Sequence, residues 1–186
     1  DIWCRLMNPL TPHLSEELND SKDLVSASLW PKVEEKKISK EAEASEELIR
    51  ITIDGMRNVL TLAKLEKPKK FTLFVAEEWL YELVNLISKE IKVTRNVGEI
   101  MRRVLEEEKM KVKGKEISKI VMMLAKDPSK IPALVLSQKE ELAAVKEAKE
   151  FLERELGCKV ELVRAEDRQH PKAQSAMPGK PGILVE

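Results

Sequence analysis

The sequence predicts an α/β protein, α+β overall, in which the remnant of a helical bundle precedes a small domain of helices on a short, mostly parallel sheet. Residues 1–66 show only helical apolar spacing, and a basic, proline-bearing connector at residues 66–70 then changes the composition. Residues 67–186 alternate short apolar runs, typical of strands, with amphipathic helical segments. We therefore expect two domains, residues 1–66 and residues 67–186.

The first part opens with a helix that breaks and restarts. Helical apolar spacing begins at Ile2, and Thr11 followed by Pro12 predicts a second helix with Thr11 as its N-cap. A long loop over residues 21–41 follows, in which the apolar run around Trp30 is expected to be an anchor. Because the chain starts in helical spacing and lacks an initiator Met, we expect it to be a fragment of a longer protein.

The segment from Glu43 to Leu65 is expected to be a helix with two apolar stripes. One stripe consists of Leu48, Ile51, Thr52, Gly55, Val59 and Leu62, and the other of Ile49, Ile53, Met56, Leu60 and Ala63. A helix that is apolar on more than one side needs several partners to cover it. The short helix within residues 1–20 cannot provide them, so further bundle helices are expected upstream.

The second part begins with a strand followed by a helix. The run from Phe71 to Val75 is almost wholly apolar, as in a strand buried on both faces. Helices are then expected around residues 80–91, 97–105, 117–124 and 138–156, with caps at Asn96 and Ser137 and a stop at Gly157. Two further strands are expected at residues 159–163 and 182–185, whereas residues 132–136 could be a strand or a helix start.

The composition excludes several classes of protein. Hydrophobic residues make up 42% of the chain and charged residues 35%, which excludes a disordered tail. No apolar run approaches the roughly 20 residues that span a bilayer, so no membrane association is expected. The two cysteines, Cys4 and Cys158, form no metal-binding or disulfide pattern and are expected to be reduced thiols of a cytoplasmic protein.

The net charge of zero hides an asymmetry along the chain. The 33 basic residues balance the 33 acidic ones, which speaks against binding of nucleic acid through bulk positive charge. Residues 1–48 nevertheless carry six basic and eleven acidic residues, so residues 49–186 hold an excess of positive charge. Much of it lies in a basic stripe that contains Lys92, Arg95, Arg102, Arg103, Lys109, Lys111, Lys113 and Lys115. This stripe could contact phosphates or could be a solvated face.

Sequence signals for catalysis are absent. The six glycines are isolated, so there is no phosphate-binding loop, and no metal-binding cluster or hydrolase motif occurs. His13 and His170 are expected to be packed or solvated residues. We therefore expect neither a catalytic residue nor a metal site in this chain. The segment from Arg164 to Glu186 is long, polar and proline-rich, and is equally consistent with a binding element and with closure of the sheet.

Two motifs in the first part carry a family resemblance. The segment from Leu6 to Leu18, LMNPLTPHLSEEL, and the later SASLWP ending at Pro31 resemble a motif pair in the anticodon-binding helical domain of class I tRNA synthetases for Leu, Ile and Val. The helix with IDGMRNV, ending at Val59, resembles the last helix of that domain. The sequence departs from the family pattern at Asn8, where a small residue is usual, and at Asn19, where an aromatic residue is usual.

The second part narrows the resemblance. The segment KKFTLFVAEEW, ending at Trp79, and the terminal PGKPGILVE, ending at Glu186, resemble the C-terminal α/β domain of archaeal leucyl-tRNA synthetases. The ATP-binding signatures and the editing domain of those enzymes are absent from the sequence. The resemblance therefore implies a C-terminal, non-catalytic part that holds no cofactor, since ATP is used by the absent catalytic core.

The same resemblance implies where RNA is bound. The C-terminal domain is expected to approach the corner and long variable arm of tRNA(Leu), with Val185 and Glu186 nearest the bases and with Ile183 and Leu184 buried. Basic side chains would hold phosphates, namely Arg102, Arg103, Arg164, Arg168, Lys172 and Lys180. The expected partners are tRNA(Leu) and the rest of the synthetase chain, without DNA. The alternative is a structural or protein-interaction domain that docks on the parent enzyme or on another synthetase without RNA contact.

Overall fold

The computed structural model describes residues 2–65, 68–107, 110 and 113–186. Contacts between residues divide the chain into two compact units, residues 1–39 and residues 40–186, and each is described by itself. The division therefore falls after Ser39 rather than at the boundary expected near residue 66. The reason is that the long helix predicted to close the first domain packs on the sheet of the second, as described below.

The first unit consists of short helices. Helix α1 spans Ile2–Met7 and α2 spans Pro12–Glu17, and the 3₁₀ turns η1 and η2 span Val25–Ala27 and Glu35–Lys37. The predicted restart at Thr11 and Pro12 is confirmed, although the Thr11 hydroxyl donates to the Met7 carbonyl at 3.3 Å instead of capping α2. The predicted anchor is wrong within this unit, because Trp30 is 63% exposed.

The second unit contains a three-stranded mixed sheet. Strands β1 (Lys70–Val75), β2 (Lys159–Arg164) and β3 (Gly182–Val185) lie in the order β2-β1-β3. β2 runs parallel to β1 and β3 runs antiparallel to it, so the sheet is mixed rather than mostly parallel. A parallel neighbour needs a long helical crossover, which the chain provides between β1 and β2. The connection from β2 to β3 holds only η4 (Ala165–Asp167) and the four-residue α10 (Pro171–Gln174).

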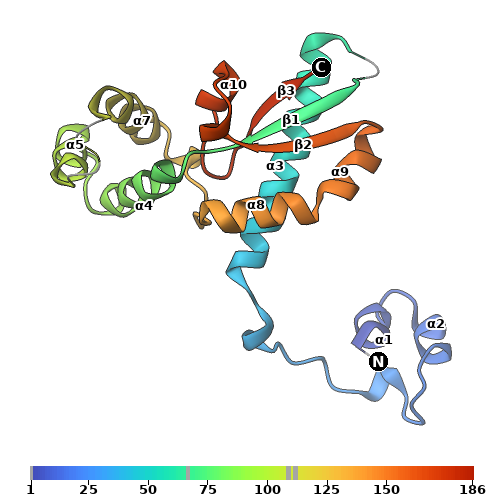
Figure 1. Cartoon of the computed structure of the whole chain (residues 1–186). Coiled ribbons are helices and arrows are strands. Elements are labelled where there is room, and N and C mark those ends of the chain that lie inside the picture. The colour runs from blue at the N-terminus through green and yellow to red at the C-terminus, as the bar shows by residue number, and fades with distance from the viewer. Residues whose placement is uncertain (1, 66–67, 108–109, 111–112) are drawn as a thin grey trace. The chain divides into compact units, whose positions relative to one another are not determined.

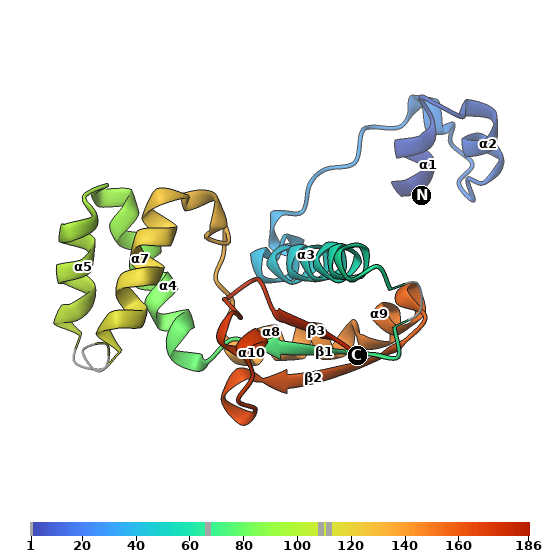
Figure 2. The same ribbon diagram turned by 90° about the horizontal axis from the view of Figure 1, so that it is seen from above.

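Three helices pack against one face of the sheet, as Figures 1 and 2 show: α3 (Lys40–Ala63), α8 (Gln138–Glu147) and α9 (Lys149–Leu156). The core on this face joins Phe71 and Leu73 of β1 to Leu48 and Met56 of α3. Close packing is needed at Gly55, where an added Cβ would lie 2.7 Å from Cδ1 of Ile183. α3 is thus an integral part of the second unit.

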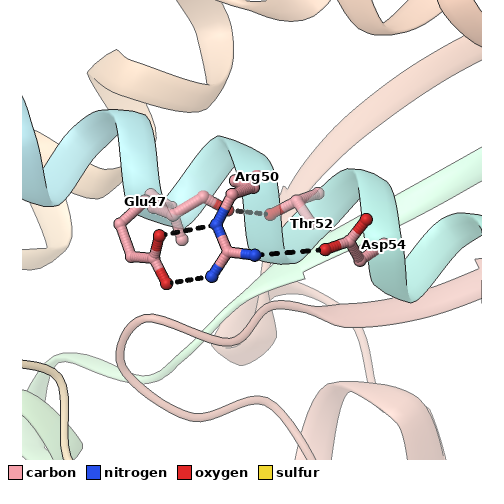
Figure 3. Close-up of polar contacts among 5 residues, drawn as sticks. Glu47, Arg50, Thr52 and Asp54 are labelled. Carbon is pink, nitrogen blue, oxygen red and sulfur yellow. Dashed lines mark hydrogen bonds and ion pairs between the residues drawn. The ribbon is translucent and has the colours of Figure 1, made fainter.

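The polar side of α3 is held by local pairs (Figure 3). The Arg50 guanidinium donates to Glu47 at 2.7 Å and lies 3.5 Å from the carboxylate of Asp54. The buried Thr52 hydroxyl donates to the carbonyl of Leu48 at 2.7 Å, which satisfies its hydrogen-bonding requirement inside the core. Because its hydroxyl is bonded within the helix, Thr52 can be buried in the apolar stripe of α3 without an unsatisfied polar group.

Three further helices, which lie between β1 and β2 in the sequence, form a second hydrophobic core. They are α4 (Glu78–Val93), α5 (Val97–Glu106) and α7 (Gly114–Lys126), and they pack around Leu83, Ile87, Ile100, Val104, Ile117 and Val121. Figure 2 shows them grouped beside the sheet. The predicted N-cap at Asn96 is confirmed, since its side chain accepts from the backbone N–H groups of Gly98 and Glu99.

The remaining predictions about local structure have mixed outcomes. The Ser137 capping box is confirmed, and Gly157 ends α9 in the left-handed conformation with φ +65°. The expected single helix over residues 138–156 is divided at Ala148 into α8 and α9. Residues 132–136 form neither a strand nor a helix, and a 3₁₀ turn, η3 (Pro128–Lys130), precedes them. Among the described residues, no helix is both long and apolar enough to cross a membrane.

Candidate nucleic-acid interface

The residues predicted to contact RNA fall in separate places. Arg102 and Arg103 lie on α5, whereas Arg164 ends β2 and Lys172 lies on α10. Glu186 follows β3 at the opposite end of the sheet, because its backbone pairs with Lys70 while Arg164 pairs with Val75. Five residue steps along β1 separate these two ends, a distance of about 17 Å. The structure therefore does not bring the predicted residues into one patch.

The C-terminus is fixed by the sheet. The N–H of Glu186 donates to the Lys70 carbonyl at 2.9 Å, and its carbonyl accepts from the N–H groups of Lys69 and Lys70 at 2.8 and 3.2 Å. The Glu186 side chain is exposed, and Val185 is half-buried. Ile183 and Leu184, expected to be buried, are half-buried as well. The last residue is thus presented to solvent on an ordered backbone.

Arg168 belongs to an ion cluster on the open face of the sheet. Its guanidinium lies 4.0 Å from the Glu161 carboxylate, which also pairs with Lys70 Nζ at 2.5 Å. The hydrogen bond from Lys70 is the main cause that lowers the pKa of Glu161. Arg168 therefore shares its charge with Glu161 unless a phosphate takes the place of that carboxylate. Arg164, Lys172 and Lys180 are exposed.

Part of the predicted basic stripe is also paired internally. Arg103 donates to Glu90 at 2.6 Å, and this bond raises the pKa of the guanidinium. Lys113 lies 2.8 Å from the Glu77 carboxylate and 4.3 Å from the centre of the Trp79 ring. Arg102 is exposed. Lys109 and Lys111 of the predicted stripe lie outside the described residues.

A polar pocket of about 440 Å³ lies at the carboxyl ends of β1 and β2; we call it the strand-end pocket. It is lined by Glu77, Ala165, Glu166, Arg168, Gln169, His170, Ala173 and Gln174. Sequence reasoning placed Arg168 and His170 in a binding tail but missed the carboxylates and amides beside them. The signal that could have found them is the order of strands, since ligands bind beyond the carboxyl ends of parallel strands where the strand order switches direction.

A larger cavity of about 1120 Å³ lies between α3, α7 and the turn over residues 177–180. Its lining is largely apolar, and the buried carboxylate of Glu141 borders it. Burial raises the pKa of Glu141, although hydrogen bonds from the Gly179 N–H and the Tyr81 hydroxyl oppose this effect. Within the described part of the chain, no group of three or more His, Cys, Asp or Glu residues is placed to hold a metal ion.

Comparison with known proteins finds similar sequences among the tRNA ligases. Residues 1–73 match the family model described as the anticodon-binding domain of tRNA ligase. The whole chain is similar to leucine–tRNA ligases, with 33% identity over 189 residues to that of Pyrococcus horikoshii and 34% to that of Methanococcus vannielii. The protein of Methanococcoides burtonii is 31% identical over 200 residues. The chain spans about a fifth of these relatives, 19% of the first two and 21% of the third.

Proposed function

Because the chain is related over its whole length to the leucine–tRNA ligases, we propose that it is the tRNA-binding C-terminal part of such an enzyme. The observation that carries this proposal is the joint match of residues 1–73 to an anticodon-binding domain and of the complete chain to leucine–tRNA ligases. The catalytic core and its ATP lie outside this part, in the cytoplasmic parent enzyme. Its role is to position tRNA(Leu) for the attachment of leucine.

The ordered C-terminus supports a contact with bases. The exposed Glu186 carboxylate can accept hydrogen bonds from exocyclic amino groups of unpaired bases in the variable arm. The backbone pairing with Lys70 fixes the backbone of Glu186 before binding, so little backbone entropy is lost on association. The exposed side chains of Arg102, Arg164 and Lys180 can neutralise phosphates.

A substitution at Glu186 tests the proposal. Deleting residues 185–186 would remove the backbone bonds to Lys69 and Lys70, so Glu186→Ala, which keeps them, is the sharper variant. In the full-length ligase we expect a roughly tenfold rise in KM for tRNA(Leu), the size of one lost base contact, while leucine-dependent pyrophosphate exchange is unchanged. Glu150→Ala on α9, also exposed, is the matched control. An unchanged KM for tRNA would show that Glu186 does not contact a base of tRNA(Leu).

One observation favours the alternative of a protein-docking domain. Large apolar side chains of the first unit are exposed, including Trp3 at 74%, Leu10 at 77% and Leu29 at 82%. Such residues fit contact with further protein surface. The salt dependence of tRNA binding separates the two functions, because phosphate contacts give a steep negative slope of log K against log salt. A chain that binds no tRNA at low salt, but binds the remainder of the ligase, would support docking alone.

A further inference from the structure

The strand-end pocket lies where the topology favours a ligand site. β1 has β2 on one side and β3 on the other, and the chain leaves β1 and β2 at the same edge. Ligands of open α/β sheets bind in the crevice outside the carboxyl ends of strands at such a switch of direction. The volume of about 440 Å³ falls within the roughly 300–1,000 Å³ that is usual for small-ligand sites.

His170 is held in one orientation at this pocket. Its ring stacks on Phe74 with 5.8 Å between ring centres and 7° between the planes. Nδ1 accepts a hydrogen bond from the N–H of Lys172 at 3.1 Å. In a neutral imidazole the proton then lies on Nε2, which becomes a hydrogen-bond donor of fixed direction. The half-buried ring thus offers the pocket an oriented N–H group.

The Glu166 carboxylate on the pocket wall is also oriented. Both of its oxygens accept from Nε2 of Gln138, at 3.2 and 3.1 Å. Gln138 is buried and donates in addition to the Ala76 carbonyl at 2.8 Å, so the amide is fixed at the end of β1. Because a carboxylate can accept about four hydrogen bonds, Glu166 retains acceptor capacity for a ligand.

Glu77 provides a second acceptor. Its Oε2 receives both the indole N–H of Trp79 at 2.6 Å and the ammonium of Lys113 at 2.8 Å. Oε1 has no hydrogen-bond partner among the described residues. The bond from Lys113 is the main cause that lowers the pKa of this carboxyl, so Glu77 is an ionised acceptor at neutral pH. The pocket therefore holds two fixed carboxylates.

The rim adds groups that suit a nucleotide. Gln169 and Gln174 line the pocket, are exposed, and have side-chain amides without a hydrogen-bond partner in the described part of the chain. Arg168 lines the same pocket, and the neighbouring Lys172 is exposed on α10. Carboxylates repel phosphate from the interior, whereas the cations at the rim attract it. The charge pattern fits a neutral hydrogen-bonding group inside and a phosphate outside.

We propose that the strand-end pocket binds one unpaired nucleobase with an exocyclic amino group, presented by bound RNA. Glu166 and Glu77 accept from the amino group, and Nε2 of His170 donates to a ring nitrogen or carbonyl of the base. Arg168 and Lys172 contact the flanking phosphate. Adenine, cytosine and guanine carry the required amino group and uracil does not, so the pocket discriminates against uracil. This inference rests on the proposed function of the chain, and it adds a base-reading site at the opposite end of the sheet from Glu186.

Short RNAs test the proposal directly on the 186-residue chain. We expect the hexamers A6 and C6 to bind roughly tenfold more tightly than U6 when binding is followed by fluorescence anisotropy, as one carboxylate–amino contact provides. Glu166→Gln and Glu77→Gln should each reduce this preference, because each replaces a carboxylate that accepts from the amino group by an amide with a single acceptor oxygen. Glu147→Gln, exposed on α8, and His13→Ala in α2 are matched controls that should leave it unchanged.

His170→Ala should weaken the binding of A6, C6 and U6 alike, because uracil also carries a carbonyl that accepts from Nε2, and a thermal melt of each variant shows whether the fold is retained. If His170→Ala does not fold, Glu166→Gln still decides, because Glu166 is exposed and its replacement keeps an oxygen that accepts from Gln138. Equal binding of A6, C6 and U6, with tRNA(Leu) still bound, would overturn the proposal that the strand-end pocket reads a base. The proposed function of the chain would then remain in place. Binding of AMP as tight as that of A6 would overturn the assignment to RNA. Absence of all RNA binding would overturn both proposals.

Discussion

The hydroxyl of Tyr81 donates a 2.8 Å hydrogen bond to Oε2 of Glu141, and both side chains are buried. The same oxygen accepts from the N–H of Gly179 at 3.2 Å, whereas Oε1 has no partner in the described residues. Burial first, and the Glu141 carboxylate second, raise the pKa of Tyr81 far above its usual range. The pair joins α4 and α8 to the turn that precedes β3, so a buried carboxyl fixes the start of the C-terminal strand.

Stability should decrease as Glu141 ionises. Burial raises the pKa of Glu141 above its ordinary value of 4.5, so its favourable contribution is complete below that value and is lost as the pH rises through the raised pKa. Glu141→Gln keeps an oxygen that accepts from Tyr81 and should remove this pH dependence. Urea unfolding of both proteins from pH 4 upward measures the effect, with the exposed Glu147→Gln as the control. Parallel stability curves for the wild type and Glu141→Gln would show that Glu141 does not titrate in this way.

Gly182→Ala should be strongly destabilising. An added Cβ would lie 2.1 Å from the carbonyl oxygen of Lys172, a backbone atom that cannot move without displacing α10 from β3. Overpacking of this kind typically lowers the free energy of unfolding by about 1–3 kcal/mol. Chemical denaturation measures it. Gly114→Ala is the matched control, because no described atom beyond its chain neighbours and its own helix backbone lies within 4 Å of the added Cβ, and it should be neutral or stabilising by up to about 1 kcal/mol.

Local structure could be predicted from the sequence because its signals act over a few residues. The caps at Asn96 and Ser137 and the stop at Gly157 depend on neighbours in the chain. The direction of β3 and the packing of α3 on the sheet depend on contacts between distant segments. The strand-end pocket also depends on such contacts, because Glu77 follows β1 whereas Glu166 follows β2. Side-chain pairing, such as that of Arg103 with Glu90, leaves no unique pattern in a chain this rich in charge.

Asn96→Ala should weaken α5. The Asn96 side-chain oxygen accepts from the N–H of Gly98 at 2.9 Å and from that of Glu99 at 3.4 Å. Loss of an N-cap typically costs about 1 kcal/mol of stability, and Asn96→Ser should restore most of it because serine also caps helices. Amide hydrogen exchange in α5, compared with that in α8, measures the change locally. Equal exchange in the wild type and Asn96→Ala would indicate that packing around Ile100, not the cap, holds the helix.

Arg102 and Arg103 should differ in their effect on RNA binding although they are adjacent. Both residues are exposed, but the Arg103 guanidinium is already bound to Glu90 at 2.6 Å. If α5 contacts tRNA phosphates, Arg102→Ala should reduce the slope of log K against log salt by about 0.7–0.9, the value for one phosphate contact. Arg103→Ala should change the slope less, since that side chain must leave Glu90 before it can reach a phosphate. The matched comparison is Arg103→Ala together with Glu90→Ala, which removes the ion pair at constant net charge. Equal slopes for the wild type and Arg102→Ala would place α5 outside the RNA interface, whereas equal losses for both single variants would show that RNA competes successfully with Glu90.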